Sequence, residues 1–322
     1  MNNFWKDEPL VSRGLEQVQM RIEQTVSGTR GFIRPYLQQL LLQQGKMLRP
    51  ACVLISSRAG GEAADEREAA DLAAGVELIH TASLIHDDII DEAPLRRGEA
   101  TLHSRIGNRK AVVAGDYLMA KAFSLFSSVP ADRIRPRVVS DRIGRLCESE
   151  IDQDGEMGDF SISISHYLRR IGGKTAALFS LSCYLGAASA NAGRLQQHRL
   201  SRFGYTLGMA FQIQDDILDY QGDERHLGKE TARDLQAGIA TLPLLCALQA
   251  DSSGALGQLL ESHPVRADEA YAMVLELGGP EKAEAIADAY RRRALREISR
   301  LPAGEASDLL KRLLERLSGR NR

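Results

Sequence analysis

Two short acidic clusters with the same pattern, DDxxD, are the residues of this sequence best suited to chemistry. The first runs from Asp87 to Asp91 and the second from Asp215 to Asp219. On a helix, the first and last aspartates of each cluster lie on one face, about one turn apart. Because apolar residues flank both clusters, the carboxylates need cations to offset their charge. Ligand sets made only of oxygen suit a hard ion such as magnesium, which also binds phosphate oxygens, so the pattern predicts magnesium-assisted diphosphate chemistry.

Each acidic cluster lies near the end of a segment whose apolar residues recur at helical spacing. The first ends a pattern over residues 62 to 92, and the second ends a pattern over residues 200 to 220. Further helical patterns cover residues 15 to 26, 107 to 128, 136 to 152 and 166 to 191, the last interrupted by Gly172 to Thr175. No apolar and polar alternation is long enough for a sheet, so the sequence predicts an all-α protein.

Basic residues stand at one helix start and close to both acidic clusters. Lys46 and Arg49 begin a helical run, where free backbone N–H groups and the helix dipole also favour an anion. Arg96 and Arg97 follow the first cluster within ten residues, and Lys229 lies in the polar loop after the second. A single basic residue usually faces solvent, so these residues are interpreted as anion-binding only because of the residues around them.

Composition excludes several classes of protein. The 322 residues carry 41 basic and 43 acidic side chains, a net charge of -2 that gives no reason to expect nucleic acid as a partner. The four cysteines form no CxxC pair, which excludes the usual zinc motifs and a disulfide framework and favours the reducing cytoplasm. The N-terminus is acidic where a signal peptide would be basic, and no apolar run is long enough to span a membrane.

Seven motifs give the chain a specific family resemblance. They are GKxxRP at residues 45–50, HxxxxxxDDxxD from His80, RRG at 96–98, KT at 174–175, FQxxDDxxD from Phe211, GK at 228–229 and TLP at 241–243. With these motifs the chain resembles the trans-polyprenyl diphosphate synthases of the isoprenoid synthase superfamily. The resemblance implies one domain over residues 1–322, an all-α bundle of about ten or more helices around a central cavity. The motifs occupy about 45–243, and helices over 244–318 complete the domain.

The resemblance also implies roles for individual residues. Magnesium would be held by Asp87, Asp88, Asp91, Asp215, Asp216 and Asp219, as three ions for which manganese can substitute. The allylic diphosphate would be bound by these ions and by Arg96, Lys174 and Lys229, with Thr175 and Gln212 lining the same site. The second diphosphate, that of isopentenyl diphosphate, would be held by Lys46, Arg49, His80 and Arg97. Ionisation of the allylic substrate would rest on Asp87, Asp88, Asp91, Asp215 and Asp216 with Lys174 and Lys229. His86, directly before the first cluster, is expected either to support a metal ligand or to be structural.

Two positions depart from the family pattern. Ile239 stands where the family often has a lysine in a GKxTLP segment, which removes one cation and places more of the diphosphate binding on Lys229. Gln44 replaces the first glycine of a GGKxxRP segment.

Product length is predicted from the two residues one turn before the first cluster. A product that grows along this helix toward its N-terminus passes Ala82 and Ser83, and each turn rises about 5.4 Å, close to one isoprene unit. Family members with short products tend to have aromatic residues there. The small side chains therefore predict a hexaprenyl to decaprenyl product of the kind used as a quinone tail, made from a farnesyl or geranylgeranyl primer.

Other interpretations remain open at the level of the sequence. The chain could make farnesyl or geranylgeranyl diphosphate, or could need a small partner subunit instead of acting as a homodimer. It could be a non-catalytic subunit, although intact aspartate clusters argue against that. A terpene cyclase would have an asymmetric second metal motif, and a di-iron bundle would need a second ExxH besides Glu77 to His80. An oily product could bring the protein to a membrane surface.

Overall fold

The described residues group into two compact units. A computed structural model describes residues 3–29, 31–42, 45–59, 64–130, 132–221, 233–262 and 266–318. Unit 1 comprises Met1–Asp141, Leu178–Gly204 and Ile298–Leu310, and unit 2 comprises Arg142–Ala177, Tyr205–Glu297 and Lys311–Arg322. The first acidic cluster therefore belongs to unit 1 and the second to unit 2. The single domain expected over the whole chain stays a prediction.

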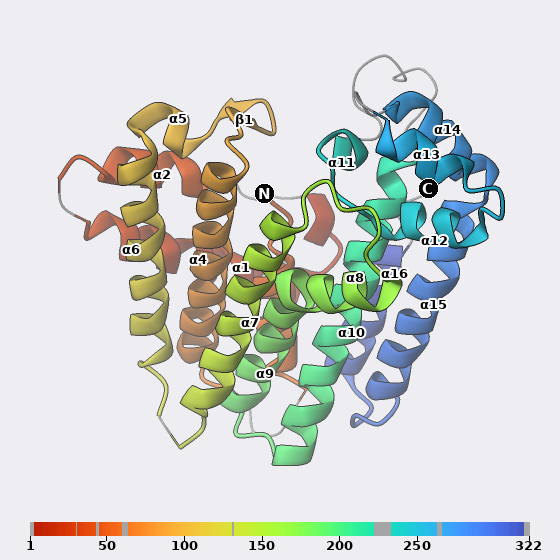
Figure 1. Cartoon of the computed structure of the whole chain (residues 1–322). Helices are drawn as coiled ribbons and strands as arrows, with labels where there is room; N and C mark the ends of the chain where they lie inside the picture. The colour runs from red at the N-terminus through yellow and green to blue at the C-terminus, as the bar shows by residue number, and fades with distance from the viewer. Residues whose placement is uncertain are drawn as a thin grey trace. The chain divides into compact units, whose positions relative to one another are not determined.

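The all-α prediction is confirmed (Figure 1). Unit 1 contains α1 (Pro9–Ser27), α2 (Arg34–Leu42), α3 (Leu48–Ser56), α4 (Glu66–Ile90), α5 (Leu102–Ile106), α6 (Asn108–Phe126) and most of α9 (Ala177–Ser189). Unit 2 contains α8 (Ile164–Ile171), α11 (Arg233–Gln236), α12 (Leu242–Ala250), α13 (Ala255–Glu261), α14 (Ala267–Glu276) and most of α15 (Gly279–Ile298). Residues of α7 (Pro136–Gly155), α10 (Arg194–Asp219) and α16 (Glu305–Ser318) occur in both units.

Helix α4, which carries the first acidic cluster, is the central element of unit 1. Asp65 caps its N-terminus by accepting hydrogen bonds from the backbone N–H groups of Arg67 and Glu68. Acidic residues in its first turn suit the positive end of the helix dipole. Most of its later residues are buried, because α1, α3 and α6 all pack against it. This packing fixes the position of the aspartates at the C-terminal end of α4.

Two glycines allow α4 and α6 to lie side by side (Figure 1). A Cβ atom on Gly75 of α4 would lie 2.5 Å from Cε1 of Phe126, and a Cβ atom on Gly115 of α6 would lie 2.2 Å from Nε2 of His86. The two contacts run in opposite order along the two helices, so the helices are antiparallel. His86 thus inserts into a space that only glycine leaves open.

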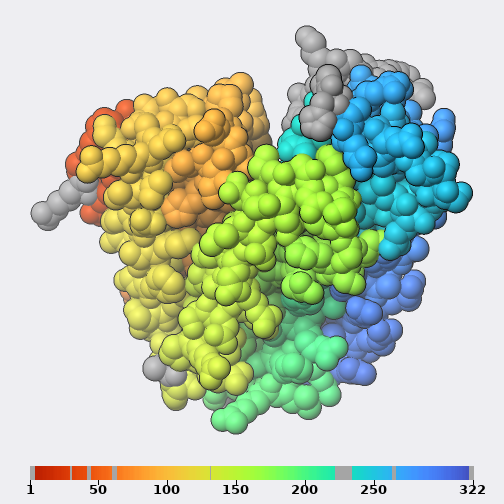
Figure 2. Space-filling model, viewed as in Figure 1, coloured from red at the N-terminus to blue at the C-terminus, as the bar shows by residue number. Residues whose placement is uncertain are grey.

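The outer side of α6 is visible at the surface in the space-filling view (Figure 2). Helix α6 leaves the apolar side chains of Val112, Val113 and Phe123 exposed, with accessibilities of 40%, 61% and 46%. Within the described parts of the chain, no helix is both long and apolar enough to cross a membrane.

The core of unit 2 forms where α8, α10, α12 and α15 meet. Its buried residues include Tyr167, Ile171, Met209, Ile213, Ile217, Leu245 and Ala283. Between α8 and α9 the backbone makes one π-helical turn, Gly172–Ala176, at the position where the sequence predicted an interruption. A Cβ atom on Gly173 would lie 1.7 Å from Oγ of Ser149, so this turn packs closely on α7.

Candidate active site

The first acidic site lies at the C-terminal end of α4. Asp87 and Asp88 occupy its last turn and Asp91 is its C-cap residue. Three carboxylates at the negative end of a helix dipole repel one another and the dipole, so the arrangement needs cations. Arg96 supplies one such cation, since its Nε atom donates to Asp88 Oδ1 over 2.6 Å. Burial raises the pKa of Asp88, and the Arg96 hydrogen bond opposes that rise.

A short hairpin holds Arg96 at this place. Strands β1 (Leu95–Arg96) and β2 (Glu99–Ala100) pair antiparallel, and Arg97 and Gly98 form the turn with φ angles of 52° and 82°. Two-residue strands are too short for the alternation by which a sheet is predicted, so this hairpin was not expected from the sequence. The hairpin base is fixed by His103, which hydrogen-bonds Ala93 O over 2.8 Å.

Arg49 and His80, both predicted to bind isopentenyl diphosphate, contact each other in unit 1. Arg49 Nη1 lies 3.2 Å from His80 Nε2, and the guanidinium group lies 4.7 Å from the ring centre of Phe179. Burial holds the pKa of His80 well below its usual value, and Arg49, Arg96 and Arg97 add to this effect. The imidazole is therefore neutral at pH 7. Because a guanidinium group only donates, Nε2 accepts and the proton lies on Nδ1.

The segment before α3 lies close to Arg97 and Phe4. A Cβ atom on Gly45 would lie 3.4 Å from Arg97 Nη1, and the Lys46 ammonium group lies 5.4 Å from the ring centre of Phe4. Burial raises the pKa of Glu77, one turn before His80, to about 7, although Arg49 and Arg97 lower it in part. Glu77 was not predicted to belong to this site.

The second acidic site ends α10 in unit 2. Asp216 is 5% exposed and accepts hydrogen bonds from Tyr167 Oη (2.5 Å) on Oδ2 and from Gln212 Nε2 (2.9 Å) on Oδ1. Gln212 Oε1 in turn accepts from Thr175 Oγ1 over 2.7 Å. Burial raises the pKa of Asp216 to about 7, and the nearby Asp234 and Asp215 also raise it, against the hydrogen bonds from Tyr167 and Gln212. Thr175, Gln212 and Asp216 thus form one chain of hydrogen bonds.

Lys174 is presented by the π-helical turn and is paired with an acid that the sequence analysis did not single out. Its Nζ atom lies 2.6 Å from Oε2 of Glu150 on α7. Lys229, the other lysine predicted for this diphosphate, lies outside the described residues. Ile239 is partly buried, and its backbone N–H donates to Asp234 O over 2.7 Å.

The two residues predicted to control product length are buried on α4. Ala82 is inaccessible, and Ser83 Oγ donates to the backbone oxygen of His80 over 2.9 Å. Ile79 and Val76, further toward the N-terminus of the helix, are also inaccessible.

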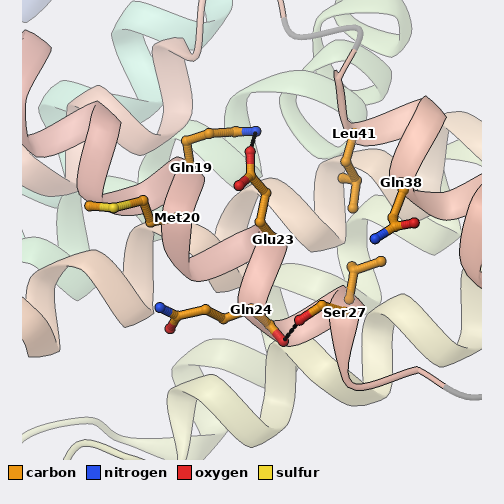
Figure 3. Close-up of a pocket in the computed structure, with 8 residues that line it drawn as sticks. Gln19, Met20, Glu23, Gln24, Ser27, Gln38 and Leu41 are labelled. Atoms are coloured by element: carbon orange, nitrogen blue, oxygen red, sulfur yellow. Dashed lines mark hydrogen bonds between the residues drawn. The ribbon is translucent and has the colours of Figure 1, made fainter.

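A separate groove of about 580 Å³ lies between α1 and α2 (Figure 3). Part of its polar lining is hydrogen-bonded within the groove: Gln19 Nε2 donates to Glu23 Oε1 over 2.7 Å and Ser27 Oγ donates to Gln24 O over 2.9 Å. Its lining includes none of the predicted site residues.

The aspartates fit a magnesium ion better than a metal held by protein alone. Their donors are all oxygen, and across the described segments no three acidic, histidine or cysteine side chains converge on one point. Magnesium commonly takes one or two carboxylates and completes its shell with water and phosphate oxygens. The donor set therefore suits an ion that binds together with a diphosphate.

The comparisons with known proteins agree with this chemistry. The family model described as polyprenyl synthetase matches residues 31–277. The chain is 36% identical over 307 residues to heptaprenyl diphosphate synthase component 2 of Geobacillus stearothermophilus, covering 94% of each chain. Other relatives are named octaprenyl and decaprenyl diphosphate synthases.

Solved structures extend the similarity to the fold. A geranylgeranyl pyrophosphate synthase from Lactobacillus brevis matches with a TM-score of 0.89 and 32% identity over 99% of each chain. A polyprenyl synthase from Caulobacter crescentus, complexed with calcium and isoprenyl diphosphate, matches with a TM-score of 0.86 and 30% identity, covering 98% of this chain and 97% of that one. A fold and site of this kind define a metal-dependent transferase of prenyl groups. The chain belongs to the polyprenyl synthetase family, as the sequence motifs predicted.

Proposed function

We propose that this protein condenses isopentenyl diphosphate head-to-tail onto an allylic diphosphate, farnesyl or geranylgeranyl, to make a long all-trans polyprenyl diphosphate for a quinone side chain. The observation that carries the proposal is the pair of acidic sites, in each of which a buried aspartate accepts a hydrogen bond from a neighbouring side chain. Relatives that make hepta-, octa- and decaprenyl products support the long-chain assignment.

Magnesium is the metal that we propose for both acidic sites, as three ions for which manganese can substitute. Asp87, Asp88 and Asp91 would hold it in unit 1, and Asp215, Asp216 and Asp219 in unit 2. When bound, magnesium neutralises the charge that develops on the departing pyrophosphate. The calcium and isoprenyl diphosphate named for the Caulobacter structure support a divalent ion beside a diphosphate.

The cationic residues divide between the two substrates. Arg96, Lys174 and Lys229 are assigned to the allylic diphosphate, with Thr175 and Gln212 beside them. One of the three Lys174 N–H groups is bonded to Glu150, which leaves two for phosphate oxygens as far as the described residues are concerned.

Lys46, Arg49, His80 and Arg97 are assigned to isopentenyl diphosphate. The contact between Arg49 and His80 supports a shared anion site, in which the neutral imidazole donates through Nδ1. The double bond of isopentenyl diphosphate then attacks the allylic cation, and the proton that is lost passes to the released pyrophosphate.

The length of the product rests on Ala82 and Ser83. Structures named geranylgeranyl pyrophosphate synthase and decaprenyl diphosphate synthase match this fold with similar TM-scores of 0.89 and 0.86, which supports a product length set by individual side chains. Small buried residues at both positions favour continued elongation past this level of α4.

The chain is proposed to act as one catalytic domain over residues 1–322, as a homodimer. The exposed apolar residues of α6 support a surface that a second copy covers. A requirement for a small partner subunit is the second candidate, favoured by the name "component 2" of two relatives. Contact with a membrane is expected only through the oily product.

The test is to incubate the purified chain with magnesium, farnesyl diphosphate and radiolabelled isopentenyl diphosphate, and to measure product length by chromatography. Products of 30 to 50 carbons, absent after chelation of the metal, are expected. Products that stop at 20 carbons, one unit beyond the farnesyl primer, would reject the long-chain assignment. No elongation by the chain alone, restored by a small partner, would replace the homodimer with the heteromeric enzyme, and no elongation under either condition would reject the function.

A further inference from the structure

Tyr167 of α8 makes a close polar contact in the second acidic site. Its hydroxyl donates to Asp216 Oδ2 over 2.5 Å, and the two residues are 49 positions apart in sequence. Tyr167 is 1% exposed and Asp216 is 5% exposed, so water has little access to this hydrogen bond. A short hydrogen bond to a buried carboxylate fixes the direction in which the carboxylate points.

The hydrogen bonds to Asp216 leave room for a cation. Tyr167 occupies one lone pair on Oδ2, and Gln212 occupies one on Oδ1. Each carboxylate oxygen can accept about two interactions. With respect to the described residues, both oxygens therefore keep a lone pair available while the group is held from two sides.

Arg170 supports Tyr167 from one turn further along the chain. Its guanidinium group lies 5.7 Å from the centre of the tyrosine ring. It is itself anchored, because Nη1 donates to Glu156 Oε2 over 2.9 Å and Nη2 donates to Ala240 O over 2.6 Å. At 5% exposure, Arg170 forms a rigid backing that restricts the ring of Tyr167.

We infer that Tyr167, backed by Arg170, is a positioning residue that orients the Asp216 carboxylate toward a divalent cation bound with diphosphate. The inference rests on the proposed function of the second acidic site and adds to it a residue outside every motif of the sequence. Partners that orient metal ligands in this way typically contribute 10- to 100-fold to metal affinity.

Tyr184 provides a matched control in unit 1. It is 2% exposed, an arginine side chain, that of Arg135, lies 5.9 Å from its ring centre, and its hydroxyl accepts a hydrogen bond from Arg135 N over 3.0 Å. Tyr167→Phe and Tyr184→Phe each remove one hydroxyl from a buried ring beside an arginine. Tyr167→Phe removes a hydrogen bond to an aspartate, whereas Tyr184→Phe removes a hydrogen bond from a backbone N–H.

The experiment measures binding of pyrophosphate at saturating and at limiting magnesium by isothermal titration calorimetry, with thermal unfolding as the check on folding. Tyr167→Phe is expected to raise the magnesium concentration at half-saturation at least tenfold, whereas Tyr184→Phe shifts it less than twofold. In an Asp216→Asn background, Tyr167→Phe should add less than a twofold shift, because the oriented group is already lost. A purely structural role would produce the same shift in both backgrounds.

Three results would overturn the inference. They are equal effects of the two tyrosine variants, an unchanged Tyr167→Phe effect in the Asp216→Asn background, and no binding of magnesium pyrophosphate to the unmodified chain. The proposed function fails separately: a chain that shows the Tyr167 effect on binding but elongates no substrate would retain the positioning residue and lose the assigned reaction.

Discussion

Lys174 and Glu150 form an ion pair in which Nζ lies 2.6 Å from Oε2. The lysine comes from the π-helical turn and the glutamate from α7, and both side chains are mostly buried. A flexible lysine side chain is thereby held in one orientation before any substrate binds. Pre-orientation of this kind reduces the entropy that binding would otherwise cost.

Glu150→Ala should therefore weaken binding of the allylic diphosphate. A hydrogen bond between charged groups contributes about 1.5–3 kcal/mol, so the KM for farnesyl diphosphate should rise roughly tenfold. The KM for isopentenyl diphosphate should stay within about twofold. Steady-state kinetics with each substrate varied in turn provides the measurement, and Glu148→Ala, an exposed acid on the same helix, is the control. Equal changes in both KM values would contradict the assignment.

Glu77 should make stability depend on pH. Burial raises its pKa in the folded protein from 4.5 to about 7, so the folded state holds the proton more tightly than the unfolded state does. The stability that this protonation provides is complete below pH 4.5 and is lost as pH rises to about 7. Glu77→Gln should therefore match the unmodified chain at pH 4.5 and exceed it at pH 8, by about 3 kcal/mol at roughly 1.4 kcal/mol per pKa unit.

Urea denaturation of both proteins at the two pH values measures this difference. Glu66→Gln, an exposed residue of the first turn of α4, controls for the loss of one negative charge. A Glu77→Gln variant whose advantage does not grow with pH would show that the buried carboxyl is not the group responsible.

Gly115→Ala should destabilise unit 1 by overpacking. The added methyl group would lie 2.2 Å from His86 Nε2, and insertions into a packed interface cost about 1–3 kcal/mol. His86→Ala in the same chain should recover part of that loss, because the clashing ring is gone. Gly144→Ala, also inside a helix but with no atom near its Cβ position, should instead stabilise by up to about 1 kcal/mol. Thermal unfolding of the variants would reveal whether His86 is the obstacle.

Ala82→Phe and Ser83→Phe should shorten the products. An aromatic ring at either position would occupy the level of α4 that the growing chain must pass, one turn before the aspartates. With a farnesyl primer, product chromatography should show the distribution move toward 20 carbons, while Ala120→Phe on the exposed side of α6 leaves it unchanged. The same long products from both α4 variants would defeat the tunnel hypothesis.

The sequence predicted those parts of the site that depend on local spacing. The two DDxxD clusters and the Lys174-Thr175 pair could be recognised because each motif is contiguous in the chain. Tyr167 and Glu150 could not, since their partners are 49 and 24 residues away and the contacts exist only after the helices pack. No periodicity in a single sequence distinguishes such a tyrosine from any other buried aromatic residue.

The fold was predictable to a similar extent. Helical periodicity located α4 and α6 to within a few residues of their observed ends, whereas α10 begins at Arg194, six residues before its predicted start. The hairpin that turns at Arg97 and Gly98 was not predicted, because its two-residue strands are too short to show alternating apolar and polar residues. The glycine pair at 172–173 correctly marked an irregularity, but the backbone widens there into a π-helical turn and the helix continues.

That widened turn has a consequence for how the chain tolerates deletions. A π-helical turn accommodates one residue more than an α-helical turn, and one residue corresponds to a rotation of about 100° around the helix axis. Loss of a single residue between Gly172 and Ala176 would let the backbone relax to ordinary winding, so the apolar side of α9 could keep its place in the core. The damage would fall on Lys174 and Thr175, which would swing away from Glu150 and Gln212, leaving a folded protein with an altered site.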